Sequence, residues 1–118
     1  MNLEIRFVKG HGDLNDERIV LKALADVNVG KYIVSDTTYH SDDEVSNKLR
    51  HIYWIPDKDV EKDDLVVIYT RKGNDKTVNN NSGNRTHFFY WGLECPVWNQ
   101  KEDAAVLFSL NAWSSKKV

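Results

Sequence analysis

Apolar residues recur at every second position in short segments of this chain, and no segment shows the spacing of three or four that marks a helix. A period of two places alternate side chains on opposite faces of a strand. The segments that show it, or that are apolar throughout, lie at residues 3–8, 18–25, 31–36, 51–56, 64–70, 87–91 and 104–110. The pattern therefore predicts an all-β fold of about seven mainly antiparallel strands with little helix, the count expected of an immunoglobulin-like β-sandwich.

The connections between these segments are rich in turn residues. The longest, at residues 71–85, reads RKGNDKTVNNNSGNR and has Val78 as its one apolar residue. A gap of that length in a small domain is either functional or disordered, so we expect a mobile connection between two strands. Residues 41–49 fit one short helical turn, with Ser41 as its cap and Glu44 as the capping-box partner.

Length and composition narrow the class of protein. The 118 residues fit a single domain over 1–118, and 41% hydrophobic and 29% charged residues are typical of soluble globular chains. The net charge of −2 gives no global bias toward nucleic acid or anionic membrane. One cysteine excludes an internal disulfide framework, and no apolar run approaches the ~20 residues of a membrane span. We expect a cytoplasmic protein.

Aromatic residues are concentrated at residues 87–99, HFFYWGLECPVWN. In a strand, Phe88 and Tyr90 point to one face while Phe89 and Trp91 point to the other, so both faces are apolar. Such a cluster is either the buried middle of a β-fold or an exposed platform for a sugar or a base. We expect Trp91 to lie in the core.

Catalytic and metal-binding patterns are scarce. His11, His40, His51 and His87 form no His-x-His or His-Glu-x-x-His motif, and there is no cysteine pair for zinc. His40 precedes Asp42, Asp43 and Glu44, which leaves a small metal-dependent hydrolase as one alternative. Cys95 precedes a proline in an expected loop, and the sequence supplies no base beside it. The interpretation that we favour is a protein without enzymatic activity, bound metal or cofactor.

The long connection carries the chain's one marked charge feature. Arg71, Lys72, Lys76 and Arg85 against the single Asp75 give it a net of +3 on an acidic body. With His87, these four basic residues are the candidate partner-binding residues. An acidic protein surface is the expected partner, and weak, sequence-independent binding of nucleic acid by residues 71–87 is the alternative.

Four stretches in this order resemble the lamin tail domain, an immunoglobulin-like sandwich of nuclear lamins and many bacterial proteins. They are ERIVLKA, GKYIVSD, YWIPDKDVEKDDLVVIYT and YWGLECPVWNQKEDAAVLF, and the likeness spans roughly residues 17–110. Tyr32 stands where tryptophan is commoner, Lys62-Asp63-Asp64 replaces a frequent Pro-Gly turn, and Glu102 replaces a glycine. The resemblance implies a non-enzymatic interaction or tethering module that presents loops to a protein partner.

Overall fold

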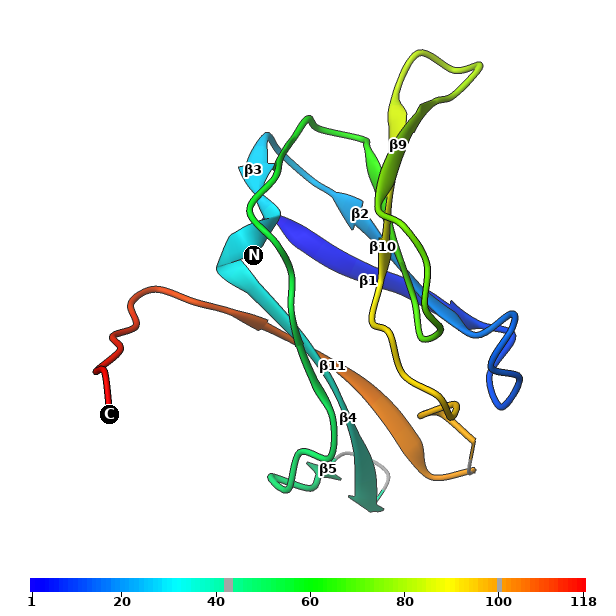
Figure 1. The fold of residues 1–118 in the computed structure, drawn as a ribbon, viewed down its shortest axis with the longest axis vertical. Coiled ribbons are helices and arrows are strands. Elements are labelled where there is room, and N and C mark those ends of the chain that lie inside the picture. Colours follow the sequence, from blue (N-terminus) through cyan, green and yellow to red (C-terminus); the bar gives the residue numbers. More distant parts are fainter. Residues whose placement is uncertain (42–43, 100) are drawn as a thin grey trace.

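The computed structural model describes residues 1–41, 44–99 and 101–118 (Figure 1). The described chain is all-β, apart from one short 3-10 helix, η1 (Val29–Lys31). Its strands are β1 (Leu3–Lys9), β2 (Arg18–Ala23), β3 (Val27–Asn28), β4 (Tyr32–Ser41), β5 (Glu44–Val45), β6 (Ile52–Trp54), β7 (Asp59–Val60), β8 (Leu65–Tyr69), β9 (Lys76–Asn79), β10 (Arg85–Tyr90) and β11 (Asp103–Ser109).

The larger sheet has five strands in the order β1-β2-β8-β10-β9. Its pairs are antiparallel except β8 and β10, which run parallel because β10 inserts between β8 and β9. The connection from β8 to β9 must therefore cross the end of β10. Gly73 makes that crossing possible, since a Cβ there would lie 2.3 Å from Cδ1 of Tyr90.

The second sheet is built on β4, which pairs with β11 on one side and with β5 and β6 on the other. In Figure 1 it lies below the five-stranded sheet, and the chain after β11 extends away from it. Strands β3 and β7 form a separate two-stranded sheet. The two main sheets give a sandwich-like arrangement.

The core lies between the sheets and follows the period-two pattern. Ile19 and Leu21 of β2 and Val66 and Ile68 of β8 are 0% exposed, while the residues between them face outward. Glu17, one residue before β2, is also 0% exposed. Its carboxylate accepts hydrogen bonds from the Thr70 hydroxyl at 2.8 Å and the Val97 N–H at 2.7 Å. This buried acid therefore holds the segment after β10 against the larger sheet.

The predicted fold class is confirmed, but the described residues form eleven strands instead of about seven. The four additional strands, β3, β5, β7 and β9, have two to four residues each. The immunoglobulin type of the sandwich stays a prediction. The expected helical turn at 41–49 is wrong for the described residues, because Ser41 ends β4 and Glu44–Val45 form β5. The connection at residues 71–85 also contains a strand that was not predicted, because Lys76–Asn79 form β9 and pair with β10. Within the described ranges, no helix is long and apolar enough to cross a membrane.

Candidate binding face

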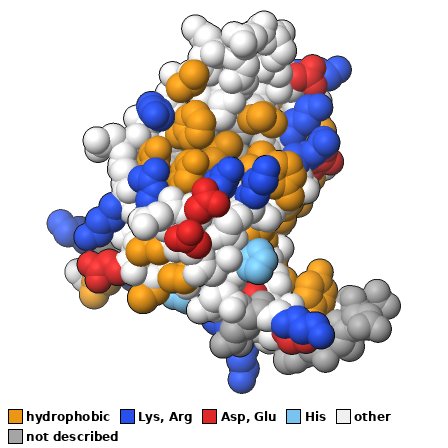
Figure 2. Space-filling model, turned by 90° about the vertical axis from the view of Figure 1, so that its right-hand side faces the viewer, with side chains coloured by type: hydrophobic (Ala, Val, Ile, Leu, Met, Phe, Trp, Pro, Cys, Tyr) orange, Lys and Arg blue, Asp and Glu red, His pale blue; other side chains and the backbone are white. Residues whose placement is uncertain are grey.

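The side of the five-stranded sheet that points away from the core carries aromatic and basic side chains, and we call it the outer face. Its register aligns them in rows across the strands. One row runs Lys9, Arg18, Tyr69, Tyr90, and the next runs Phe7, Val20, Val67, Phe88, Lys76. Figure 2 shows hydrophobic side chains gathered on the face in view, with Lys and Arg side chains and some Asp and Glu side chains among and around them.

Three half-buried aromatic residues form the centre of the outer face. The Tyr69 ring stacks on Tyr90 with centroids 5.4 Å apart and on Phe88 with centroids 6.4 Å apart. Since β8 and β10 are parallel neighbours, Tyr69 and Tyr90 stand directly opposite each other. The parallel insertion of β10 thus builds the aromatic cluster.

Four cations lie over the rings of this face, and one of them, Arg18, already forms an ion pair with Asp16. The other three are Arg71, Lys76 and Lys9. The Arg71 guanidinium is 4.8 Å from the Tyr69 centroid and 5.2 Å from that of Tyr90. The Lys76 ammonium is 5.5 Å from the Phe88 centroid, and that of Lys9 is 5.7 Å from the Phe7 centroid. Within the described residues, none of these three cations forms an ion pair with a carboxylate. The outer face therefore carries three cations that form no ion pair within the described chain.

A groove of about 460 Å³ continues the outer face toward the β9–β10 hairpin. Phe7, Val20 and Leu65 contribute to its lining, and Phe7 is 48% exposed. Asn80 and Ser82, from the hairpin tip, line its far side. The groove adds apolar surface with a polar rim to the aromatic cluster.

The five predicted partner-binding residues separate into three groups. Arg71 and Lys76 belong to the outer face, and whether they bind a partner stays a prediction. Lys72 lies 3.5 Å from Glu94, and Arg85 lies 3.5 Å from the buried Asp64. His87 is 1% exposed, so its inclusion among residues that reach a partner is wrong.

The aromatic segment serves the core on one side and the outer face on the other. Phe89 and Trp98 are 5% and 4% exposed and belong to the core. Trp91 is only half-buried, with its ring centroid 5.7 Å from that of Tyr53 and 5.9 Å from that of Trp98. The prediction that Trp91 is a core residue is therefore wrong in degree, since it packs at the margin.

Burial, and then the negative charge of Asp75, raises the pKa of Tyr53 to about 12.

A hydrogen-bonded chain links Thr77, His87 and Asp64. The Thr77 hydroxyl lies 3.0 Å from His87 Nδ1, and His87 Nε2 lies 2.9 Å from Asp64 Oδ2. This order of hydroxyl, imidazole and carboxylate is that of a nucleophilic triad. Such a site also needs donors aimed at the developing oxyanion, and Thr77 stands exposed on the edge strand β9. We assign these hydrogen bonds a role in stability, because they join β9 and β10 to the turn before β8.

Asp64 is the carboxylate at the end of this series of hydrogen bonds. Burial disfavours its ionised form, but hydrogen bonds from His87 and from the backbone N–H groups of Glu61 and Arg85, with the charge of His87, outweigh this cost. The pKa of Asp64 therefore lies below its ordinary value. This role was not predicted, because in the sequence Asp64 is recognisable only as a turn residue before an apolar strand.

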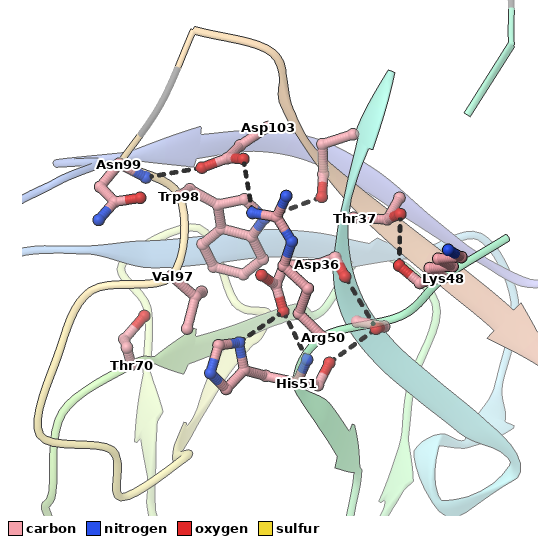
Figure 3. Close-up of polar contacts among 12 residues, drawn as sticks. Asp36, Thr37, Lys48, Arg50, His51, Thr70, Val97, Trp98, Asn99 and Asp103 are labelled. Atoms are coloured by element: carbon pink, nitrogen blue, oxygen red, sulfur yellow. Dashed lines mark hydrogen bonds and ion pairs between the residues drawn. The ribbon is translucent and has the colours of Figure 1, made fainter. Parts of the chain in front are cut away.

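Two further buried acids hold the loops beside Trp98 (Figure 3). Asp36 is 1% exposed, and its Oδ1 accepts from the His51 backbone N–H at 2.8 Å and lies 3.0 Å from His51 Nδ1. Asp103 Oδ1 lies 3.5 Å from Arg50 Nη1, and its Oδ2 accepts from the Asn99 N–H at 3.0 Å. These contacts tie the loop before β6 to β4 and β11, and the loop before β11 to the start of that strand.

The metal alternative gains no support from the parts of the chain that the structure describes. No group of three or more His, Cys, Asp or Glu side chains there could hold an ion. Asp42 and Asp43 of the predicted cluster lie outside the described residues. Cys95 is exposed.

Comparison with known proteins found no match: no family model, curated protein or solved structure matches the chain.

Proposed function

We propose that this chain is a non-enzymatic interaction module that binds an acidic, partly aromatic protein segment through the outer face. The observation that carries the proposal is the set of three cations, Lys9, Arg71 and Lys76, which lie over exposed or half-buried rings without a described carboxylate partner. Aromatic residues and arginine are enriched in the centre of protein interfaces. A carboxylate on the partner would supply the missing charge, and the groove would hold an apolar side chain.

The resemblance of residues 17–110 to lamin tail domains supports the same class of function, because those domains present surfaces to other macromolecules. The proposed surface differs from the sequence-based expectation in one respect. It is one face of the five-stranded sheet, with the connection from β8 to β9 beside it. Pairing between the strands therefore fixes most of this surface before a partner binds. A preorganised surface loses less conformational entropy when a partner binds.

Binding of single-stranded nucleic acid to the outer face is the competing proposal. Bases stack on open aromatic faces, and a basic groove must follow the backbone. Here Arg18 and Arg71 lie over the Tyr69 ring, and Tyr90 stacks on it. These contacts leave little open ring for a base, and the net charge of −2 opposes a polyanion. We therefore favour the protein partner.

Selection from a phage-displayed random peptide library tests this proposal. We expect selected peptides rich in Asp, Glu and aromatic residues, with binding that weakens as salt is added. The variant Arg71→Glu/Lys76→Glu should bind them at least tenfold more weakly. The matched control Lys48→Glu/Lys101→Glu reverses two exposed charges away from the outer face and should bind as the parent does.

Three results would overturn the proposal. The first is a selected peptide set that binds the Arg71→Glu/Lys76→Glu variant as tightly as the parent, and the second is no selected peptide at all. The third is tight binding of a labelled oligo-dT by the parent, abolished in that variant, without any peptide binding. That third result would establish the nucleic-acid alternative.

A further inference from the structure

Two exposed tryptophans meet on a part of the molecule that the outer face does not use. Trp54, at the end of β6, is 45% exposed, and Trp113, in the segment after β11, is 63% exposed. Their ring centroids lie 4.8 Å apart with planes at 87°. A large aromatic side chain left in water forfeits the stabilisation that its burial would give, so an exposed pair calls for an explanation.

A cavity of about 630 Å³ opens beside this pair, within the range of small-molecule sites. Its lining combines the two indoles and Pro56 with polar side chains, which include Lys31, Asp57 and Asn111. Such a cavity offers an apolar wall with hydrogen-bonding groups around it.

The site is held in place by backbone contacts. The Trp54 Nε1–H donates to the Gly30 carbonyl oxygen at 2.7 Å, and the Leu110 N–H donates to the Lys31 carbonyl oxygen at 2.8 Å. Gly30 also allows Asp57 to approach, since a Cβ at position 30 would lie 2.9 Å from the Asp57 Cα. Both tryptophans are thus joined to the same short helix, Trp54 directly and Trp113 through the chain at Leu110.

The geometry limits the class of ligand. An edge-to-face contact at 4.8 Å covers one face of one indole with the edge of the other, so the second indole keeps its faces for a ligand, at right angles to the first. A quaternary ammonium cage needs several open ring faces directed at one point. Lys31 and Asp57 carry opposite charges, so the lining favours neither an anion nor a cation.

We propose that this cavity binds a neutral sugar residue of an oligosaccharide. The apolar C–H face of a pyranose would stack on the open indole, and its hydroxyl groups would exchange hydrogen bonds with Asp57, Asn111 and Lys31. This proposal does not depend on the outer face, and the two surfaces are lined by different residues.

The test uses the four indole N–H signals in the NMR spectrum of the whole chain, from Trp54, Trp91, Trp98 and Trp113. The probes are soluble neutral oligomers of glucose, xylose, mannose and N-acetylglucosamine, each titrated to millimolar concentration. We expect at least one oligomer to shift the Trp54 and Trp113 signals in a saturable way while the buried Trp98 signal stays in place. Trp113→Ala should weaken that binding at least tenfold, and Asp57→Ala should weaken it several-fold. Phe88→Ala, on the outer face, should leave it unchanged.

Trp113→Ala removes a largely exposed side chain, so the folded state should survive the change, and the Trp98 signal reports on this directly. The proposal is overturned if no oligomer shifts the Trp54 and Trp113 signals, or if the binding persists in Trp113→Ala. It is also overturned if choline or a proline-rich peptide shifts those signals and the sugars do not.

Discussion

The guanidinium of Arg71 lies 4.8 Å from the ring centroid of Tyr69, which joins the loop after β8 to the outer face of the sheet. The side chain is held on its other side by the loop backbones, because Nη1 donates to the Lys72 carbonyl oxygen at 3.0 Å and Nε to that of Asn15 at 3.3 Å. Arg71, which lies in the connection that was expected to be mobile, is therefore held against the sheet by contacts on both sides.

Phe88 and Phe89 test the division of the aromatic segment between two faces. Phe89→Ala should lower the free energy of unfolding by about 3–5 kcal/mol, because it empties a core position. Phe88→Ala should cost less than half as much, because its ring is already half in water. Urea unfolding followed by circular dichroism measures both. Equal losses would mean that the outer face is as deeply packed as the core.

Trp91 and Trp98 differ in burial in the same way as Phe88 and Phe89. Trp98 is 4% exposed and donates its Nε1–H to the Ala104 carbonyl oxygen at 3.0 Å, so Trp98→Ala should cost about 3–5 kcal/mol. Trp91→Ala should cost less, since Trp91 packs at the margin of the core. Thermal unfolding of the two variants gives the comparison. A larger loss for Trp91 than for Trp98 would restore Trp91 as the central core residue.

Glu17→Gln tests the anchoring of the segment after β10. Gln replaces one acceptor oxygen with an NH₂ group, which would face backbone N–H donors that the carboxylate now satisfies. A buried donor left without an acceptor costs about 1–3 kcal/mol, and the loss should be of that size or greater. Hydrogen exchange should accelerate first at Val97 and Trp98. Unchanged protection there would show that Glu17 does not hold the segment.

Asp64 gives the protein a predicted dependence of stability on pH. Because its pKa is lower in the folded state than in the unfolded state, its contribution is fully present above the unfolded value of about 3.9 and is lost as the pH falls through the folded value. Asp64→Asn should therefore destabilise the protein near pH 7, and the difference from the parent should shrink below about pH 4. The free energy of unfolding, measured by urea at several pH values, checks this. A difference that stays constant down to pH 2 would contradict it.

The alternation of apolar residues was sufficient to predict the longer strands, because each of them buries one face. The segments at 64–70 and 87–91 correspond to β8 and β10, whose inward residues are buried. It was not sufficient for β9, since Lys76–Asn79 are all exposed and pair only through their backbone. An edge strand of this kind has no burial pattern to detect.

The binding surface was predicted only in part for a related reason. Arg71 and Lys76 were identified by their charge, but the neutralisation of Arg85 depends on Asp64, twenty-one residues earlier in the chain. The aromatic partner Tyr69 was also missed, because its contact with Tyr90 arises from the parallel pairing of β8 and β10. No local pattern encodes that pairing. His87 was misplaced because it was grouped with the nearby basic residue Arg85, whereas the strand turns its side chain inward.

The most direct test of the proposed function is chemical-shift mapping of the labelled protein with an acidic peptide selected by binding. We predict that the largest backbone shifts fall on β8, β9 and β10, around Tyr69, Lys76 and Phe88, and that the Arg71→Glu/Lys76→Glu variant loses them. Shifts concentrated on β4 and β11, with the outer face unchanged, would contradict the proposal.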